Sequence, residues 1–148
     1  MRRDSRLRYL AQMVRIDWKG DLAFEAMPPS GKPVVLDSAS LGTEPQGPSP
    51  TEMLLAAVGA CTAMDVISIL KKKRQIVESY RVEVENEYFD PDAWPRPMSK
   101  IIVRHYVSGK EIDPEAVARA VQLSDEKYCR VASTLRQGVE IETSWQVE

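Results

Sequence analysis

Cysteine and histidine are scarce in this chain, whose 148 residues include two cysteines, Cys61 and Cys129, and one histidine, His105. Two cysteines are too few for the disulfide framework that holds small secreted domains together. Structural zinc sites usually draw four nitrogen or sulfur ligands from closely spaced positions, whereas these three residues stand far apart in the sequence. We therefore expect neither a metal ion nor a cofactor.

A strong net charge is also absent. The formal net charge is -2, so electrostatics give no reason to expect nucleic acid or an acidic membrane as a partner. The arginines clustered within residues 1–8 are expected to form a solvated terminus rather than a phosphate-binding patch. The start of the chain lacks the apolar segment and cleavage site of a signal peptide, which favours a cytoplasmic location.

No apolar run is long enough to favour a membrane span. The longest apolar-rich stretch, Met53 to Leu70, is interrupted by Cys61, Thr62, Asp65 and Ser68. Such a pattern is typical of a helix buried in a soluble protein. A chain of this length fits a single domain, residues 1–148, with a sizeable core.

The first third of the chain predicts three short strands. Alternation of apolar and polar residues marks Met13 to Trp18 and Leu22 to Met27, and a third short stretch covers Val34 to Leu36. Gly20-Asp21 separates the first two stretches, and the segment from Pro28 to Gly31 separates the second and third. Both are turn signals, so the pattern predicts an antiparallel meander.

A long helix is predicted after the loop of residues 38–50, which is rich in glycine and proline. Ser49 fits the N-cap, Pro50 the first helical position and Glu52 the third, which together form a capping box. Apolar and small side chains then follow on nearly every side as far as Leu70. We expect this central helix to be buried on most sides, more than one chain of this size can cover.

Two long strands are predicted next. Arg81 to Tyr88 and Ile101 to Val107 alternate in polarity and are expected to pair. The segment between them, residues 90–97, contains three prolines and is expected to form a loop with Trp94 as its apolar anchor.

The last third predicts two helices and a closing strand. Asp113 and Pro114 fit the start of the first helix, whose expected inner face comprises Val117, Ala120, Val121 and Ser124. The second is expected from Cys129 to about Arg136, and the strand from Val139 to Val147. The order βββ-α-ββ-αα-β predicts an α+β fold with antiparallel sheet.

The surroundings of the two cysteines differ from those of ordinary core residues. Cys61 lies in the middle of the long helix among alanines and a glycine, which leave room for a substrate or a second sulfur and also permit close packing. Cys129 lies where a helix begins, and backbone N–H groups there favour a thiolate. Asp65, one turn after Cys61, would disfavour a thiolate if it pointed the same way. We expect it instead at a helix exit or a subunit contact.

The two thiols support peroxide reduction if the fold brings them together. One thiolate attacks a peroxide and becomes a sulfenic acid, and the second thiol condenses with it to a disulfide, which an external dithiol reduces. A purely structural role for both cysteines is the alternative from the residues alone.

Two stretches resemble the OsmC/Ohr family of osmotically inducible and organic hydroperoxide resistance proteins, and most closely its YhfA-type branch. They are Ser49 to Thr62, continued by Asp65 to Lys72, and Glu126 to Leu135. The resemblance implies an OsmC-like fold and an intertwined homodimer with the cysteine helices at its centre. It also implies that Cys61 is the peroxidatic and Cys129 the resolving thiol. Organic hydroperoxides would be the substrates, and a lipoyl group or thioredoxin the dithiol.

The chain departs from the peroxidase branches of that family at one paired feature. In those branches a glutamate ten positions before the first cysteine pairs with an arginine of the N-terminal sheet, whereas here that position is Thr51. The segment from Met27 to Asp37 offers only Lys32, and capping explains Glu52. Our leading hypothesis is a thiol-dependent peroxidase. The alternative is a non-catalytic dimer of the same fold that binds a small apolar ligand or senses redox state.

Overall fold

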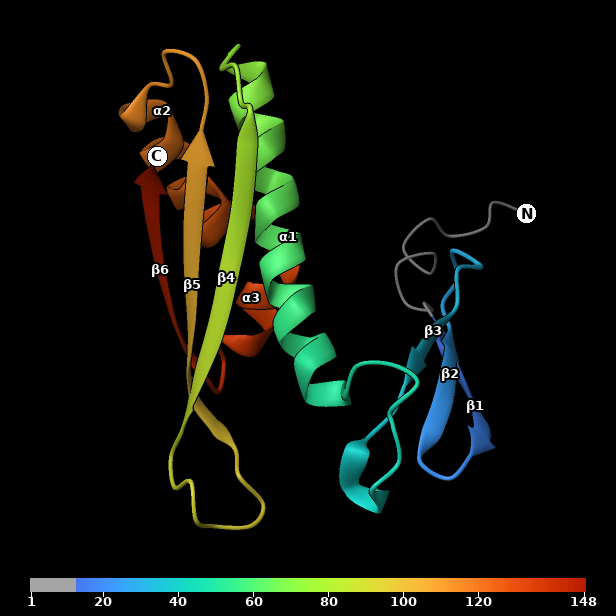
Figure 1. Cartoon of the computed structure of the whole chain (residues 1–148). Coiled ribbons are helices and arrows are strands. Elements are labelled where there is room, and N and C mark those ends of the chain that lie inside the picture. Colours follow the sequence, from blue (N-terminus) through green and yellow to red (C-terminus); the bar gives the residue numbers. More distant parts are fainter. Residues whose placement is uncertain (1–12) are drawn as a thin grey trace, which may run out of the picture. The chain divides into compact units, whose positions relative to one another are not determined.

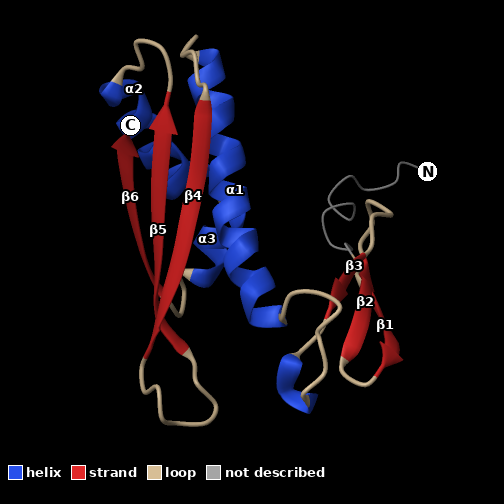
Figure 2. Cartoon of the chain, viewed as in Figure 1, coloured by secondary structure: helices blue, strands red, loops and turns tan. Residues whose placement is uncertain are grey.

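A computed structural model describes residues 13–148 of the chain (Figure 1). The arginine cluster of residues 1–8 lies outside the described residues. The described chain divides between Met53 and Leu54 into two compact units, each of which has its own three-stranded sheet (Figure 2).

The N-terminal unit contains an antiparallel sheet with the strand order β1-β2-β3. Its strands are β1 (Arg15–Gly20), β2 (Ala23–Met27) and β3 (Val34–Leu36). The turn between β1 and β2 uses positive φ angles at Gly20 (111°) and Asp21 (45°), a conformation that glycine and aspartate tolerate best. The predicted strands and meander are confirmed.

The loop after β3 is held by a buried carboxylate and a close backbone approach. Asp37 accepts a hydrogen bond from the backbone N–H of Gln46 at 2.9 Å. A Cβ atom at Gly47 would stand 2.1 Å from the carbonyl oxygen of Val35, so only glycine fits there. A short helix, η2 (Ala39–Leu41), lies within this loop.

The long helix α1 (Pro50–Lys72) begins at the predicted capping box. The backbone N–H of Glu52 donates to Ser49 Oγ at 3.2 Å, and the backbone N–H of Ser49 donates to Glu52 Oε2 at 2.7 Å. These bonds hold the pKa of the Glu52 carboxyl below its ordinary value. The capping role predicted for Glu52 is confirmed.

The C-terminal unit contains a mixed sheet with the strand order β4-β5-β6. Strand β4 (Ser79–Tyr88) pairs with β5 (Met98–Ser108) in the predicted antiparallel sense, while β6 (Glu140–Val147) pairs with β5 in parallel. The expectation of a wholly antiparallel sheet is therefore wrong at β6.

The parallel pairing follows from the connection between β5 and β6. The chain crosses the sheet through α2 (Pro114–Leu123), the π-helical turn η3 (Ser124–Tyr128) and α3 (Arg130–Leu135). This crossover returns the chain to the end of the sheet at which β5 begins. Strand β6 starts at that same end and therefore runs parallel to β5. The predicted inner face of α2 is buried, including Ser124.

The three helices cover one face of the sheet, as Figure 1 shows. One buried cluster joins α1, β5 and α2 through Val66, Leu70, Val107, Ala116, Val117, Ala120 and Val121. A second joins α1 to the sheet through Val58, Ile101 and Val103. The core therefore fixes the middle and end of α1 against the segment that carries Cys129.

The described chain buries only one side of α1. Its buried residues are Val58, Gly59, Thr62, Val66 and Leu70. Met64 is 69% exposed and Leu54 is 38% exposed. The expectation that one chain of this size does not cover the helix agrees with this partial burial. Helix α1 is long and apolar enough to cross a membrane. Core helices of soluble proteins meet the same criteria of length and composition.

The loop between β4 and β5 also differs from expectation. Trp94 is 85% exposed, so it does not anchor the loop to the described part of its own chain. The guanidinium of Arg96 lies over its ring, 5.6 Å from the ring centroid.

Candidate active site

Helix α1 presents Cys61 and Asp65 on one side. The two residues are four positions apart, which places them one above the other on a helix face. The neighbouring stripe, which includes Thr62 and Val66, packs against the core and holds the orientation of the helix. Both Cys61 and Asp65 are half-buried.

Cys129 lies at the junction between η3 and α3. Its backbone N–H donates to the carbonyl oxygen of Ser124 at 2.9 Å, which closes the π-helical turn. Its extended backbone makes it the N-cap of α3, and its Sγ accepts a hydrogen bond from the backbone N–H of Ala132 at 3.4 Å. Cys129 is 2% exposed, so this geometry is enclosed by protein.

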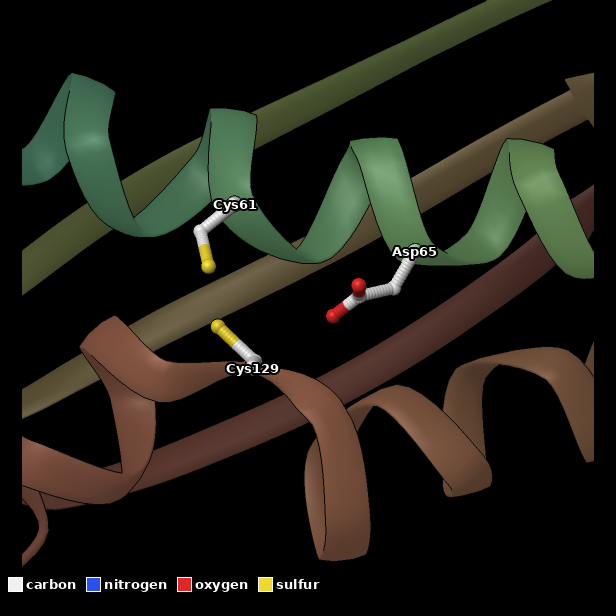
Figure 3. Close-up of side chains that lie close together, drawn as sticks. All are labelled: Cys61, Asp65 and Cys129. Atoms are coloured by element: carbon white, nitrogen blue, oxygen red, sulfur yellow. The ribbon is translucent and has the colours of Figure 1, made fainter. Parts of the chain in front are cut away.

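The three side chains meet in one space (Figure 3). One ligand atom from each of Cys61, Asp65 and Cys129 lies within 4.8 Å of the other two. The fold thus brings together two sulfurs that are 68 positions apart in the sequence. The expectation that Asp65 lies at a helix exit is wrong, because its carboxylate faces the two thiols.

A buried chain of hydroxyl groups holds Asp65 in place. Ser124 Oγ donates to Asp65 Oδ2 at 3.0 Å, and Ser124 Oγ lies 2.9 Å from Thr62 Oγ1. Because a hydroxyl has a single proton and that of Ser124 is donated to Asp65, the hydroxyl of Thr62 donates to Ser124. This network joins α1 to the π-helical turn that carries Cys129.

The thiol of Cys129 is strongly biased toward its protonated form. Burial raises its pKa to about 11, the neighbouring Cys61 thiol and the Asp65 charge act in the same direction, and the N–H of Ala132 opposes them. The helix-start effect predicted for Cys129 is therefore present, but burial outweighs it.

A cavity of about 230 Å³ lies beside Asp65, between α1 and the segment formed by the end of α2 and η3. Its lining combines a carboxylate, an ammonium group, two hydroxyls and two aliphatic side chains, from Asp65, Ser68, Ile69, Lys72, Leu123 and Tyr128. Asp65 lines this cavity and also belongs to the cluster with Cys61 and Cys129, so one carboxylate is shared by the cavity and the cluster.

His105 is not part of this cluster. It is fully buried in β5, and its Nδ1 shares a hydrogen bond of 2.8 Å with the hydroxyl of Tyr80. Burial lowers the pKa of His105 to about 4, so it is neutral at physiological pH. Among the described residues, the one group of His, Cys, Asp and Glu side chains close enough to share an ion is formed by Cys61, Asp65 and Cys129.

The fold and the paired thiols define a small α+β protein with a two-cysteine site. A family model described as OsmC-like protein matches residues 42–144, and the chain belongs to this family. The resemblance of the motifs around Cys61 and Cys129 is thereby confirmed.

Individual relatives agree with this assignment. Protein YhfA of Escherichia coli K12 is 40% identical over 133 residues, which cover 90% of this chain and 96% of that protein. A solved hypothetical protein from Aquifex aeolicus VF5 is 27% identical with a TM-score of 0.80, over 93% of this chain and 96% of the other. An organic hydroperoxide resistance protein from Elizabethkingia anophelis shares the fold, with a TM-score of 0.65 at 10% identity, over 93% and 98% of the two chains.

Proposed function

We propose that this protein is a thiol-dependent peroxidase that reduces organic hydroperoxides through Cys61 and Cys129. The observation that carries the proposal is the approach of the two sulfurs to within 4.8 Å from positions far apart in the chain. Related folds include proteins named for organic hydroperoxide resistance, which supports the choice of substrate class.

The environments of the two thiols suit different roles. Cys61 is the more accessible of the two and shares a helix face with Asp65, which lines the cavity, so it is assigned the attack on peroxide. Cys129 is buried, and a thiol with a pKa of about 11 is a poor first nucleophile at neutral pH. It is therefore assigned the second, resolving step.

The proposed cycle balances in three steps. The Cys61 thiolate attacks the outer oxygen of the hydroperoxide, the O–O bond breaks, and the leaving alkoxide takes a proton to become an alcohol. The Cys129 sulfur attacks the resulting sulfenic acid, and water leaves as the disulfide forms. An external dithiol then reduces the disulfide and is itself oxidised to a disulfide.

In this proposal the protein is a homodimer in the cytoplasm. Exposed apolar side chains on α1, among them Leu54 and Met64, give a second copy of the chain a surface to cover. A reducing compartment keeps both thiols available between turnovers.

Peroxide consumption by the reduced protein tests the proposal. Cumene hydroperoxide should oxidise both thiols of each chain rapidly, and a dithiol such as dihydrolipoamide should restore them and permit repeated turnover. Thiols that react no faster than free cysteine would contradict the proposal and favour the non-catalytic dimer with an apolar ligand.

Single-cysteine variants test the two roles. Cys61→Ser should abolish turnover, whereas Cys129→Ser should consume one peroxide per chain and stop at a sulfenic acid that dimedone traps. Repeated turnover in Cys61→Ser would contradict the assignment of the peroxidatic thiol.

A further inference from the structure

We propose that Cys61, Asp65 and Cys129 form a binding site for one zinc-like divalent cation, held by two thiolates and one carboxylate. The proposal follows from the convergence of these three side chains in Figure 3. It departs from the expectation of no metal ion, which considered His105 as the third ligand instead of Asp65, and it does not depend on the proposed peroxidase activity.

The distances between the ligand atoms are close to those of a zinc site. Zinc binds sulfur at about 2.3 Å and carboxylate oxygen at about 2.0–2.2 Å, so tetrahedral ligand atoms stand roughly 3.5–4 Å apart. Here the three atoms already lie within 4.8 Å of one another. We therefore expect rotation of the three side chains to close the site around an ion.

The groups around the ligands are those that support metal binding. Asp65 Oδ2 is held by Ser124, and Ser124 is held by Thr62, which fixes the carboxylate beside the two sulfurs. The Sγ of Cys129 accepts the backbone N–H of Ala132. Hydrogen bonds of this kind orient metal ligands and reduce the entropy that they lose on binding.

The charge of the cluster also favours a divalent cation. Two thiolates and a carboxylate cannot stay ionised together in a largely enclosed space without a counter-charge. When a divalent cation binds, each thiol releases its proton to solvent, and the ion offsets the two new negative charges. The cluster then keeps the single net negative charge that it has with both thiols protonated and Asp65 ionised.

The ligand types select the ion. Thiolates favour zinc and other soft ions over magnesium and calcium, which prefer sets of oxygen ligands. Three protein ligands leave a fourth position for water, as in zinc sites that are not purely structural. One consequence rests on the proposed function. A bound ion would occupy the sulfur lone pairs that attack peroxide, so zinc would reversibly inhibit the peroxidase activity.

Cobalt titration of the untagged, reduced protein tests the site without any peroxide. Co²⁺ should bind at one ion per chain with the thiolate-to-cobalt charge-transfer bands and strong visible bands of a tetrahedral site, and Zn²⁺ should displace it. Alkylation of both thiols with iodoacetamide should abolish these bands. The only histidine, His105, is fully buried, so it does not offer a competing surface site.

Variants separate this site from nonspecific binding. Cys61→Ser and Cys129→Ser should each weaken cobalt binding at least about 100-fold, and Asp65→Asn at least about tenfold. Asp92→Asn, in the exposed loop between β4 and β5, is the matched control and should leave the affinity unchanged.

Thermal unfolding of each metal-free variant shows whether it folds, and alkylated wild-type protein provides the same test without any substitution. Cobalt bands that survive alkylation, or an affinity that Asp65→Asn leaves unchanged, would overturn the proposal. Absence of peroxidase activity in the wild type would contradict the proposed function but not the metal site, because metal binding is measured independently.

Discussion

Asp65 brings a negative charge into a space that it shares with two thiols, and its neighbours keep it there. Ser124 donates to its carboxylate at 3.0 Å, and the same charge helps to raise the pKa of Tyr80, an effect due first to burial. At the scale of single residues, this carboxylate adds to the effect of burial, which is the main cause of the raised pKa of the Cys129 thiol.

Replacing Asp65 by asparagine should lower the pKa of the Cys129 thiol. Burial, which Asp65→Asn leaves in place, accounts for most of the rise to about 11, so the pKa should fall but stay above its ordinary value. Thiolate absorbance in the ultraviolet, followed against pH in a Cys61→Ser background, measures it. Asp92→Asn in the same background is the control, and an unchanged Cys129 pKa in Asp65→Asn would contradict the prediction.

His105 should make stability depend on pH. Its pKa is about 4 in the folded protein and about 6.5 when unfolded, so between these values the unfolded chain binds the extra proton. The stabilisation is complete above pH 6.5 and is lost as pH falls toward 4. Urea unfolding should give a free energy about 2 kcal/mol lower at pH 5 than at pH 7 from this residue alone.

The variant His105→Gln isolates this contribution from that of the carboxylates. Its own stability will be lower because the hydrogen bond with Tyr80 is altered, so only the difference between the two pH values is compared. An equal pH dependence in the variant and the wild type would rule out His105 as the source.

The sequence indicated Cys61 and Cys129 as residues of the site, but it did not indicate Asp65 as the third. The positions of Cys61 and Asp65 fix a shared helix face, yet no local signal says that η3 lies opposite that face. Only the packing of Val66 and Leu70 against α2 makes this choice, through contacts between residues more than forty positions apart. Neighbouring residues alone therefore led to the wrong expectation that Asp65 lies at a helix exit.

At the scale of elements, local chemistry predicted where helices begin better than how strands are arranged. The side chains of Ser49 and Asp113 cap α1 and α2 as expected, because capping depends on residues within one turn. The parallel direction of β6 depends on a crossover of about thirty residues, which periodicity does not encode. The π-helical turn η3 likewise had no recognised signal.

Gly59 lies where α1 packs closely against β4, and a larger residue there should destabilise the protein. A Cβ atom would lie 2.7 Å from Val84 Cγ2, and the branched valine side chain has little freedom to move away. We expect Gly59→Ala to cost about 1–2 kcal/mol, net of the roughly 1 kcal/mol that alanine gains over glycine in a helix.

Gly138→Ala is the control for this prediction. A Cβ atom there meets nothing within 4 Å, so the free energy of unfolding in urea should be unchanged or slightly increased. Equal effects of the two substitutions would show that close packing does not explain the glycine at position 59.

At the scale of the whole molecule, α1 has more apolar surface than its own chain covers. Ala56, Ala60 and Met64 recur every four residues on its exposed side. Exposed apolar surface of this extent is typical of a protein interface. The sequence predicted the excess correctly, since a helix that is apolar all round needs more cover than the remaining elements of a short chain provide.

A charge placed on this surface should therefore weaken the proposed homodimer. Met64 is 69% exposed within the chain, and in the dimer Met64→Glu would place a carboxylate in an apolar contact. We expect sedimentation to give about twice the chain mass of 16.7 kDa for the wild type, and a dissociation constant roughly 100-fold higher for Met64→Glu.

Ile76→Glu is the matched control, because Ile76 is 60% exposed but lies beyond the end of α1, and its variant should remain dimeric. A monomeric wild type would remove the dimer from the proposed function. A dimer equally sensitive to both variants would place the interface away from the exposed side of α1.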